Sequence, residues 1–415
     1  MNAPADTQQI DHHRDTFPPL KLAYFSPLPP ARSGIADYSR EILPHLAQMA
    51  DVSLFCADPE DVDSTLVEQF PVHAFSDYAN MRWSFDLPLY QFGNNTTHHE
   101  EIYRHFCRYP GAAVLHDVIL HHFIAHRTVG HGNFPGYTRE LGYVLGATGV
   151  NYSWAIRYGE REHPLTELTL NQRVADLSLG LLVHSQHAQD LIHATRPRQP
   201  VWVVPAPIAA YEETIADAAA VKEQLPWRED AIIFASVGQV TAAKRIDHAL
   251  AAFARLRHEV PRARYLLVGE VFRNEVNLSA LLEEHDLHDD VYVTGFVEDL
   301  QSFMAWLSAA DVVVNLRYPT VGETSAAALR ALSAGRPLIV YDHGWYAELP
   351  DDVALKAPLL DDDGLLAAMR RLAGDVQERE HMGLQAHAYA RGQHHPAQTA
   401  RAYIDAVEQM LSPNA

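Results

Sequence analysis

The stretch NLRYPTVGETSAAALRALSAGRPLIVYD, residues 315–342, has the pattern of a βαβ unit. An apolar run over 312–316 ends in a polar loop, a segment rich in Ala, Ser and Leu follows, and a second apolar run covers 337–340. The middle segment predicts a helix that begins at about Thr324. Small residues at a helix start let a ligand approach closely, and the free amides and the helix dipole favour a phosphate. The stretch therefore predicts a parallel sheet with an anion site at a strand end.

Similar apolar runs alternate with amphipathic segments along the rest of the chain. This alternation is typical of parallel sheets covered by helices. The runs fall into two sets, separated by a polar segment rich in Ala and Glu, so we expect two domains joined by a linker over 211–228. The expected strands are 20–25, 52–55, 87–92, 112–115, 181–184 and 201–204 in the first domain, and 232–237, 265–268, 291–294, 312–316 and 337–340 in the second.

Two helices are predicted from apolar residues at three- and four-residue steps. One begins near Ile246 and continues through Leu256, behind the strand over 232–237. The other covers the end of the chain, from Pro396 to Leu411, since proline is tolerated in the first turn of a helix.

The charge balance excludes several classes of partner. The 415 residues include 32 Lys and Arg against 53 Asp and Glu, a formal net charge of −21. Nucleic-acid binders carry an excess of cations, so binding to DNA or RNA is not expected. The polar residues 1–20 predict a flexible tail and not a signal peptide, and no apolar run approaches the ~20 residues of a membrane span. With only two Cys, the expected location is the cytoplasm, with peripheral contact at the inner membrane face left open.

Two further strand ends carry candidate anion-binding residues. Gly34 follows the first strand and precedes a helix in SPLPPARSGIADYSREIL, where it leaves the backbone open to a ligand or simply makes a tight turn. Lys244 lies six residues after Gly238, where its ammonium group could reach over the strand ends or remain a solvated surface cation. The Glu323 carboxylate could accept hydrogen bonds from sugar hydroxyl groups next to a phosphate. The alternative is an ordinary acidic residue in the first turn of a helix, stabilised by the helix dipole.

Histidine is abundant in the first half of the chain, in YQFGNNTTHHEEIYRHF and VLHDVILHHFIAH. His116, Asp117, His121 and His122 mix imidazole with carboxylate, as metal sites do. Their spacing is not that of HExxH, however, and a strand end followed by a helix with partly exposed histidines is the favoured interpretation. We therefore expect no metal site.

The order of these motifs resembles that of nucleotide-sugar glycosyltransferases with the GT-B fold. It is most similar to the retaining glycosyltransferases of family four, the glycosyl transferases group 1. The motifs are the Gly34 loop, VLHD (114–117), LLVHS (181–185), VGQVTAAKRIDHALAAFARL (237–256), YLLVGE (265–270), VYVTGFVEDL (291–300), DVVVNL (311–316) and GETSAAALRALSAGRPLIV (322–340).

The resemblance implies an α/β architecture of two Rossmann-like parallel-sheet domains that face a cleft. The first, over 21–210, would be the acceptor side, and the second, over 229–385, would bind the nucleotide sugar. A C-terminal helix within 386–415 would pack back on the first domain.

The resemblance also implies roles for individual residues. The candidate catalytic residues are His116, which would contact the donor sugar near its reacting face, Lys244 on the diphosphate, and Glu323 on sugar hydroxyls. The candidate donor-binding residues are Gly34, Gly238, Gln239, Lys244, Gly295, Phe296, Glu323, Thr324, Ser325, Ala326 and Arg330. Within this set, Gly295 and Phe296 would meet the base. Outside it, His98, Asn94 and Asn95 of the histidine-rich stretch are candidates for the lining of an acceptor pocket.

The chain departs from the family pattern at two positions. Gln239 stands where the family has an arginine five residues before the lysine, so one diphosphate cation is missing. Arg330 replaces the second Glu of the family's Glu-x7-Glu motif, and Glu323 is shifted by one from the first. Arg330 could supply the lost charge, in which case ribose recognition must differ.

The implied activity is transfer of a sugar from a UDP-sugar or GDP-sugar to an acceptor hydroxyl. The acceptor would be a glycan, a lipid-linked glycan or a small molecule, as in polysaccharide biosynthesis, and transfer would proceed with retention and without metal or cofactor. Two alternatives stay open: a catalytically inactive partner of the same fold, and a sugar-nucleotide epimerase or inverting transferase. The base, the acceptor and the oligomeric state are not predicted.

Overall fold

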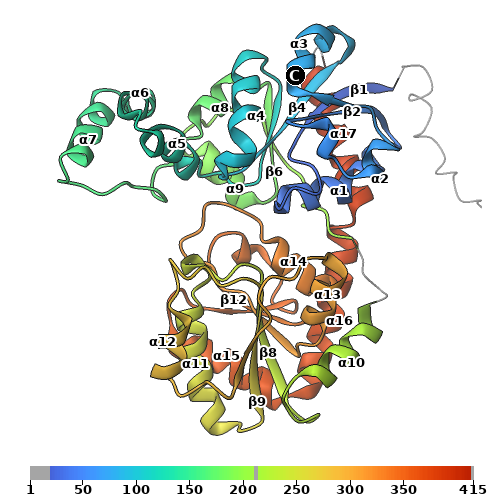
Figure 1. Ribbon diagram of the computed structural model, residues 1–415, viewed down its shortest axis with the longest axis vertical. Coiled ribbons are helices and arrows are strands. Elements are labelled where there is room, and N and C mark those ends of the chain that lie inside the picture. Colours follow the sequence, from blue (N-terminus) through green and yellow to red (C-terminus); the bar gives the residue numbers. More distant parts are fainter. Residues whose placement is uncertain (1–18, 210–213, 413–415) are drawn as a thin grey trace, which may run out of the picture.

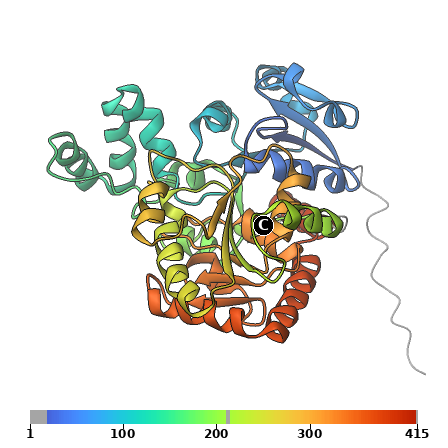
Figure 2. The same ribbon diagram turned by 60° about the horizontal axis from the view of Figure 1, so that its bottom comes forward.

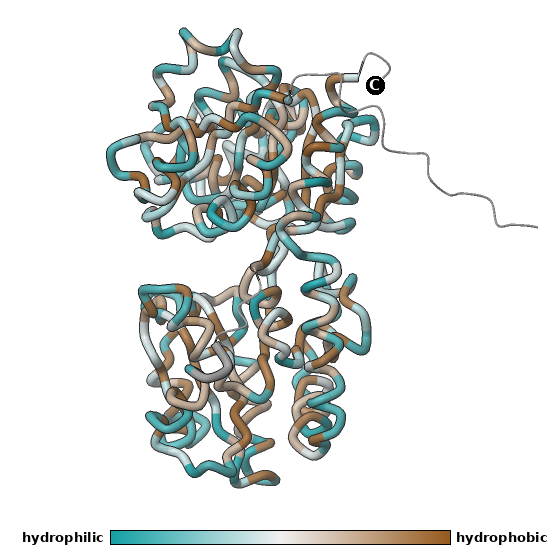
Figure 3. The backbone as a smooth tube through the Cα atoms, turned by 90° about the vertical axis from the view of Figure 1, so that its right-hand side faces the viewer, coloured by the Kyte–Doolittle hydropathy of each residue, from teal (hydrophilic) through white to brown (hydrophobic). Residues whose placement is uncertain are grey.

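The computed structural model describes residues 19–209 and 214–412, which form two α/β domains (Figure 1). Figure 3 shows the backbone of the first domain above that of the second. Of the expected flexible tail, residues 1–18 lie outside the described residues.

The first domain is built on seven parallel strands in the order β3-β2-β1-β4-β5-β6-β7. Its core is strongly aromatic: the ring of Phe25 on β1 packs against the rings of Phe55 and Tyr90 on the two neighbouring strands. The strands are β1 (Leu20–Phe25), β2 (Ala50–Cys56), β3 (Val72–Ala74), β4 (Leu87–Phe92), β5 (Ala112–Leu115), β6 (Gly180–Val183) and β7 (Val201–Val203).

The second domain is built on six parallel strands in the order β10-β9-β8-β11-β12-β13. All six residues of its central strand β8 are buried, as expected for a strand covered by helices on both faces. The strands are β8 (Ile232–Val237), β9 (Ala263–Val268), β10 (Val291–Val293), β11 (Val312–Val314), β12 (Leu338–Tyr341) and β13 (Ala354–Ala357).

Each strand expected from the sequence is present, to within two residues at either end. Two further strands, β3 and β13, were not predicted. Both are short strands at the edge of a sheet, and each carries a polar residue, His73 or Lys356, that interrupts the apolar pattern.

Helices cover both sheets. In the first domain α6 and α7 project sideways from the rest (Figures 1 and 2). The helices of this domain are α1 (Gly34–Leu46), α2 (Ser64–Val67), α3 (Tyr78–Met81), α4 (Thr96–Arg108), α5 (His121–Thr128), α6 (Phe134–Leu145), α7 (Ala147–Arg157), α8 (Gln172–Leu177) and α9 (Gln186–His193). Those that follow are α10 (Thr214–Gln224), α11 (Ile246–Glu259), α12 (Leu278–Glu284), α13 (Leu300–Ser308), α14 (Ala326–Ser333), α15 (Asp362–Gly374), α16 (Val376–Gln393) and α17 (Pro396–Leu411). The short 3-10 helices η5 (Ala242–Lys244) and η6 (Gly344–Glu348) lie near the strand ends of the second domain.

The two helices predicted from periodicity begin where expected, α11 at Ile246 and α17 at Pro396. Helix α17 packs against α1 of the first domain, where the hydroxyl groups of Tyr38 and Tyr403 are hydrogen bonded. The preceding helix α16 packs on α14 and continues without a break to Gln393, so the chain crosses to the first domain later than the boundary expected at residue 386.

The segment expected as a linker, 211–228, includes α10. This helix packs against α13, so it is part of the second domain.

Both sheets have a switch point where the strand order reverses. In the first sheet it lies between β1 and β4, and in the second between β8 and β11. Open α/β sheets bind ligands in the crevice at such a point, outside the carboxyl ends of the strands. The loops after β1, β8 and β11 are therefore the candidate positions for a ligand site.

Candidate active site

Lys244 lies at the switch point of the second sheet. Its Nζ donates to the carbonyl of Val237 at 3.0 Å and to Oδ1 of Asn315 at 3.1 Å, and its side chain is buried. Burial lowers the pKa of Lys244 to about 7; the Arg317 guanidinium lowers it further and Glu323 opposes the change. Close to neutral pH this lysine is therefore present in both its charged and its neutral form.

Arg317 and Glu323 form an ion pair in the loop after β11. Nε of Arg317 lies 2.9 Å from Oε1 of Glu323, and both side chains are mostly buried. The other carboxylate oxygen, Oε2, accepts from Oγ1 of Thr320 and from the backbone N–H of Val321, both at 2.7 Å. Because a carboxylate has about four acceptor sites, Glu323 keeps the capacity to accept from a ligand hydroxyl.

The N-terminus of α14 follows this loop. The helix begins at Ala326 and not at the predicted Thr324, because the side chain of Ser325 accepts from the backbone N–H of Ala328 and so acts as the N-cap. Thr324 instead contacts the first domain, with its Oγ1 3.4 Å from the carbonyl oxygen of His184.

His116 follows β5 in the first domain. Its Nε2 is 2.8 Å from Oε1 of Gln91, and its ring packs between the rings of Tyr38 and His184, with centroids 4.5 and 5.0 Å away. Burial, with His184 as a lesser cause, lowers the pKa of His116 well below its ordinary value. His116 is therefore neutral at physiological pH and can contribute hydrogen bonds but no charge.

Asp117 is the next residue, and its carboxylate accepts from the backbone N–H of Asn94 at 2.8 Å. Burial raises its pKa to about 6, and the negative charge of Glu323 adds to the effect. This influence shows that acidic groups from both domains lie near one another. The side chain of Asn94 is itself used to hold this turn, through Ile119 and Phe123, and Asn95 is the N-cap of α4.

The two domains meet through polar contacts at the strand ends. The carbonyl oxygen of Val321 accepts from the backbone N–H groups of Val118 and Ile119 at 2.9 and 2.8 Å. Nearby, the Glu348 carboxylate of η6 accepts from the first two N–H groups of α9, those of Gln186 at 3.1 Å and His187 at 2.6 Å. The carboxyl ends of the two sheets therefore face one another, as the sequence predicts.

The predicted glycines lie at loop positions around this interface. Gly34 is the first residue of α1, and a Cβ atom added to it would meet no atom within 4 Å, so the space beside it is open. Gly238 has a φ of +90° and passes close to Lys244, because a Cβ atom there would lie 3.5 Å from Nζ. Both positions leave the backbone accessible to a ligand.

The segment predicted to meet the base lies at the edge of the site. Phe296 is 47% exposed, and the guanidinium of Arg32 from the first domain lies 4.6 Å from its ring centroid. Gly295, just before it, has a φ of +72°. Gln239, at the position of the missing arginine, is exposed.

Arg330 corrects one expectation. Its guanidinium is directed at the first domain, 3.4 Å from Oε1 of Glu41 and 3.6 Å from Oδ2 of Asp37, both on α1. It is therefore an interdomain ion-pair residue and not a free cation that replaces the missing diphosphate charge. The cation beside Lys244 is Arg317 instead.

The histidines considered for a metal are engaged with different partners. His116 is bonded to Gln91, whereas Nε2 of His121 lies 2.7 Å from the hydroxyl of Tyr137. Within residues 19–209 and 214–412, no group of three or more His, Cys, Asp or Glu side chains is placed to hold a metal ion.

One buried residue of the site, Asn315, was absent from the sequence prediction. It lies within the apolar run over 312–316, just before the polar loop, and its polar side chain in that run was the available signal. Periodicity could not show that this side chain turns inward toward Lys244, or that Arg317 of the loop pairs with Glu323.

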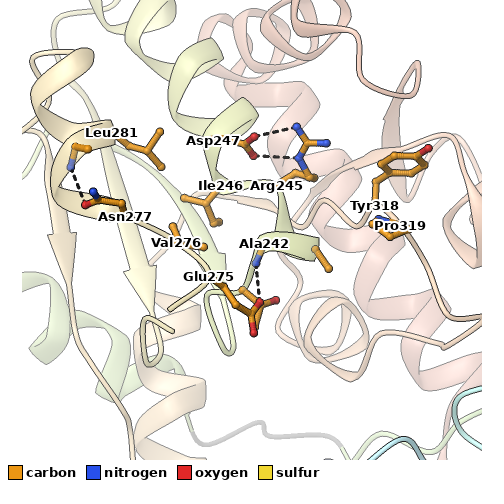
Figure 4. A pocket seen from close by; sticks show the side chains of 13 residues that line it. Ala242, Arg245, Ile246, Asp247, Glu275, Val276, Asn277, Leu281, Tyr318 and Pro319 are labelled. Atoms are coloured by element: carbon orange, nitrogen blue, oxygen red, sulfur yellow. Dashed lines mark hydrogen bonds and ion pairs between the residues drawn. The ribbon is translucent and has the colours of Figure 1, made fainter. Parts of the chain in front are cut away.

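A cavity of about 540 Å³ lies beside η5 (Figure 4). Residues from the starts of α11 and α12 line it, with Glu275 hydrogen bonded to the backbone N–H of Ala242 and Arg245 paired with Asp247. None of the predicted donor-binding residues, all of which are described, lines this cavity. Its residues carry no anion-binding arrangement, so the polar cluster around Lys244 remains the candidate site.

Residues 217–388 match the family described as glycosyl transferases group 1. The second domain is a group 1 glycosyltransferase domain. The match covers the strands and loops that carry Lys244, Asn315, Arg317 and Glu323. No curated protein is detectably similar to the chain in sequence.

Solved structures with the GT-B fold match both domains of the chain. HepE from Anabaena, solved in complex with UDP, is 15% identical with a TM-score of 0.67, and the match covers 94% of this chain and all of that chain. Sucrose-phosphate synthase from Thermosynechococcus elongatus is 16% identical with a TM-score of 0.68, over 94% and 99% of the two chains. WaaG, a glycosyltransferase involved in lipopolysaccharide biosynthesis, is 14% identical with a TM-score of 0.60, over 94% and 99%.

Among the residues that the structure describes, no helix has both the length and the hydrophobicity that a membrane span requires.

Proposed function

We propose that this glycosyltransferase uses a nucleoside-diphosphate sugar, a UDP-sugar or GDP-sugar, as donor and an alcohol as acceptor. The observation that carries the proposal is the convergence of Lys244, Arg317 and the N-terminus of α14 at the switch point of the second sheet. Two cations and a helix N-terminus are the groups that bind a diphosphate. The similarity in fold to HepE, which was solved with UDP, supports the same class of donor.

Each group has a distinct task in this proposal. Cleavage of the anomeric bond leaves negative charge on the diphosphate, which Lys244, Arg317 and the α14 amides stabilise. Glu323 accepts from hydroxyl groups of the sugar with its free lone pairs. Neutral His116, from the other domain, contacts the donor sugar by hydrogen bonding.

We further propose that transfer proceeds with retention, without metal or cofactor. The acceptor oxygen attacks the anomeric carbon on the face that the diphosphate leaves, and the departing phosphate oxygen takes the acceptor proton. The bond to the diphosphate breaks as the bond to the acceptor forms, so protons and electrons balance. Glu323 is held by Arg317 and is assigned to sugar hydroxyls in this scheme.

The test measures binding and turnover separately. Calorimetry with UDP-glucose and GDP-mannose determines the base, and hydrolysis or transfer of the bound sugar determines activity, with product NMR to read the anomeric configuration. Lys244→Met should lower turnover by ~10²–10³-fold. Lys222→Met, which removes an exposed lysine paired with Asp311, should leave turnover unchanged. Normal turnover in Lys244→Met contradicts the assignment, and an inverted product contradicts retention.

A non-catalytic partner is the second candidate, because Gln239 is exposed and Arg330 is paired with Glu41 instead of facing a ligand. This alternative predicts nucleotide binding with no loss of the sugar at any acceptor concentration. The same calorimetry and hydrolysis measurements therefore separate the two.

A further inference from the structure

Asn315 lies at the centre of the candidate site and has no task in the transfer described so far. It follows β11, and only 1% of its surface is exposed. Its Oδ1 accepts from Nζ of Lys244 at 3.1 Å, while its Nδ2 donates to Oγ of Ser325 at 3.0 Å and to the hydroxyl of Tyr346 at 2.8 Å. One amide group thus uses its acceptor and both donor hydrogens.

The chemistry of these partners fixes the orientation of the amide. The charged form of Lys244 can only donate, so in that form the oxygen of Asn315 faces the lysine. The nitrogen then faces Ser325, whose Oγ also accepts from the backbone N–H of Ala328 as the N-cap of α14. The position of the lysine charge and the position of the helix N-terminus are therefore linked through a single side chain.

We propose that Asn315 is a positioning residue for the diphosphate, which holds Nζ of Lys244 and the N-cap of α14 in a fixed relation so that both act on the same phosphate groups. This inference rests on the proposed function, because it takes a nucleoside diphosphate as the ligand. A lysine side chain has four rotatable bonds, and holding its end in place before binding reduces the entropy lost when the ligand arrives.

The neutrality of Asn315 matters for this task. The charged groups that face Lys244 are Arg317, which repels it, and Glu323, which attracts it; the hydroxyl of Tyr346 lies on the far side of the amide. An aspartate at position 315 would orient the ammonium group equally well but would cancel its charge. An amide orients the cation and leaves its charge for the phosphate.

The first experiment needs no ligand. The chain has only four lysines, Lys21, Lys222, Lys244 and Lys356, so an NMR titration of selectively labelled lysine side chains resolves each one, with Lys244→Met giving the assignment. We expect Asn315→Asp to move the Lys244 midpoint upward by at least one pH unit and Asn315→Ala to move it downward. Unchanged midpoints in both variants would overturn the proposal, because the Asn315 amide would then have no influence on the Lys244 ammonium group.

The second experiment separates positioning from a merely structural effect. The Kd of UDP and of GDP is measured for the wild type, Asn315→Ala, Lys244→Met and the double variant. We expect Asn315→Ala to weaken binding about tenfold alone but less than twofold when Lys244 is already absent, since contacting residues couple. An equal loss in both backgrounds would show that Asn315 does not act through Lys244 and would overturn the proposal.

The controls keep the outcomes distinct. Asn277→Ala removes another asparagine of the second domain, which caps α12, and should change neither the titration nor the Kd. If thermal unfolding shows that Asn315→Ala is not folded, Asn315→Asp replaces it in the comparison of single and double variants. The loss of affinity should again occur only in the protein that retains Lys244. If the wild type binds no nucleotide, the proposed function is overturned, whereas the lysine titration still shows whether Asn315 holds Lys244.

Discussion

Raising the pH should weaken donor binding through Lys244. In this structure the pKa of the lysine is about 7, because the side chain is buried and close to Arg317. Only the charged form attracts the diphosphate, and a bound diphosphate keeps it charged to a much higher pH. Below pH 7 most of the protein already carries the charged lysine. Above pH 7 the lysine must take up a proton when the donor binds, and this lowers the affinity.

The size of the effect follows from this pKa. If the bound lysine stays charged throughout, the apparent Kd should rise about 25-fold between pH 6.5 and pH 8.5, equivalent to about 1.9 kcal/mol. The slope should be small below pH 7 and approach tenfold per pH unit above it. A nucleotide sugar is the suitable ligand, since its phosphate groups do not titrate in this range.

Calorimetry in two buffers with different ionisation enthalpies measures both the Kd and the proton uptake. Lys222→Met is the matched control and should keep the full pH dependence. Other groups that titrate in this range also change the long-range field, but that contribution should disappear in high salt, whereas the charge of the buried lysine is much less screened. A flat Kd at high salt, with no proton uptake at pH 8, would refute the role given to Lys244.

Three further predictions follow from single side chains. Arg317→Met should weaken nucleotide binding by tenfold or more, because it removes a charged hydrogen bond worth about 1.5–3 kcal/mol; the exposed Arg255→Met is the control for calorimetry, and equal affinities would exclude Arg317 from the site. Glu41→Gln removes the carboxylate opposite Arg330 and should lower the free energy of unfolding by about 1–3 kcal/mol in urea titrations, whereas the exposed Glu68→Gln should not; no difference between the two would show that the pair is unimportant. Gly34→Ala should fold normally, because its Cβ meets no atom, yet weaken donor binding if the ligand fills that space; Gly374→Ala, equally open but remote, is its control, and identical binding isotherms would remove Gly34 from the site.

The strand pattern of the sequence was sufficient to predict two α/β domains with parallel sheets, whereas the GT-B arrangement was predicted from the family resemblance. Buried strands such as β8 are continuous apolar runs, and the residues after them mark the edge where ligands bind. The strands that escaped prediction, β3 and β13, are edge strands whose polar residues break the run.

Side-chain direction was the part that the sequence could not supply. Arg330 lies on a helix that could present it to a phosphate or to the first domain, and the choice depends on Glu41, nearly three hundred residues earlier in the chain. Asn315 meets Lys244, which comes from a distant segment of the chain, and Arg317 pairs with Glu323 only in the folded conformation of their shared loop. Such partners depend on tertiary packing, which local periodicity does not encode.

The contact between Glu348 and α9 provides a way to observe separation of the two domains. The first N–H groups of a helix have no partner within it, and those of Gln186 and His187 are satisfied by a carboxylate from the opposite domain. Whenever the domains separate, these two amides lose their acceptor and become free to exchange with solvent. Hydrogen-exchange rates of the Gln186 and His187 amides should therefore report how often the two domains separate, without a label or a substrate.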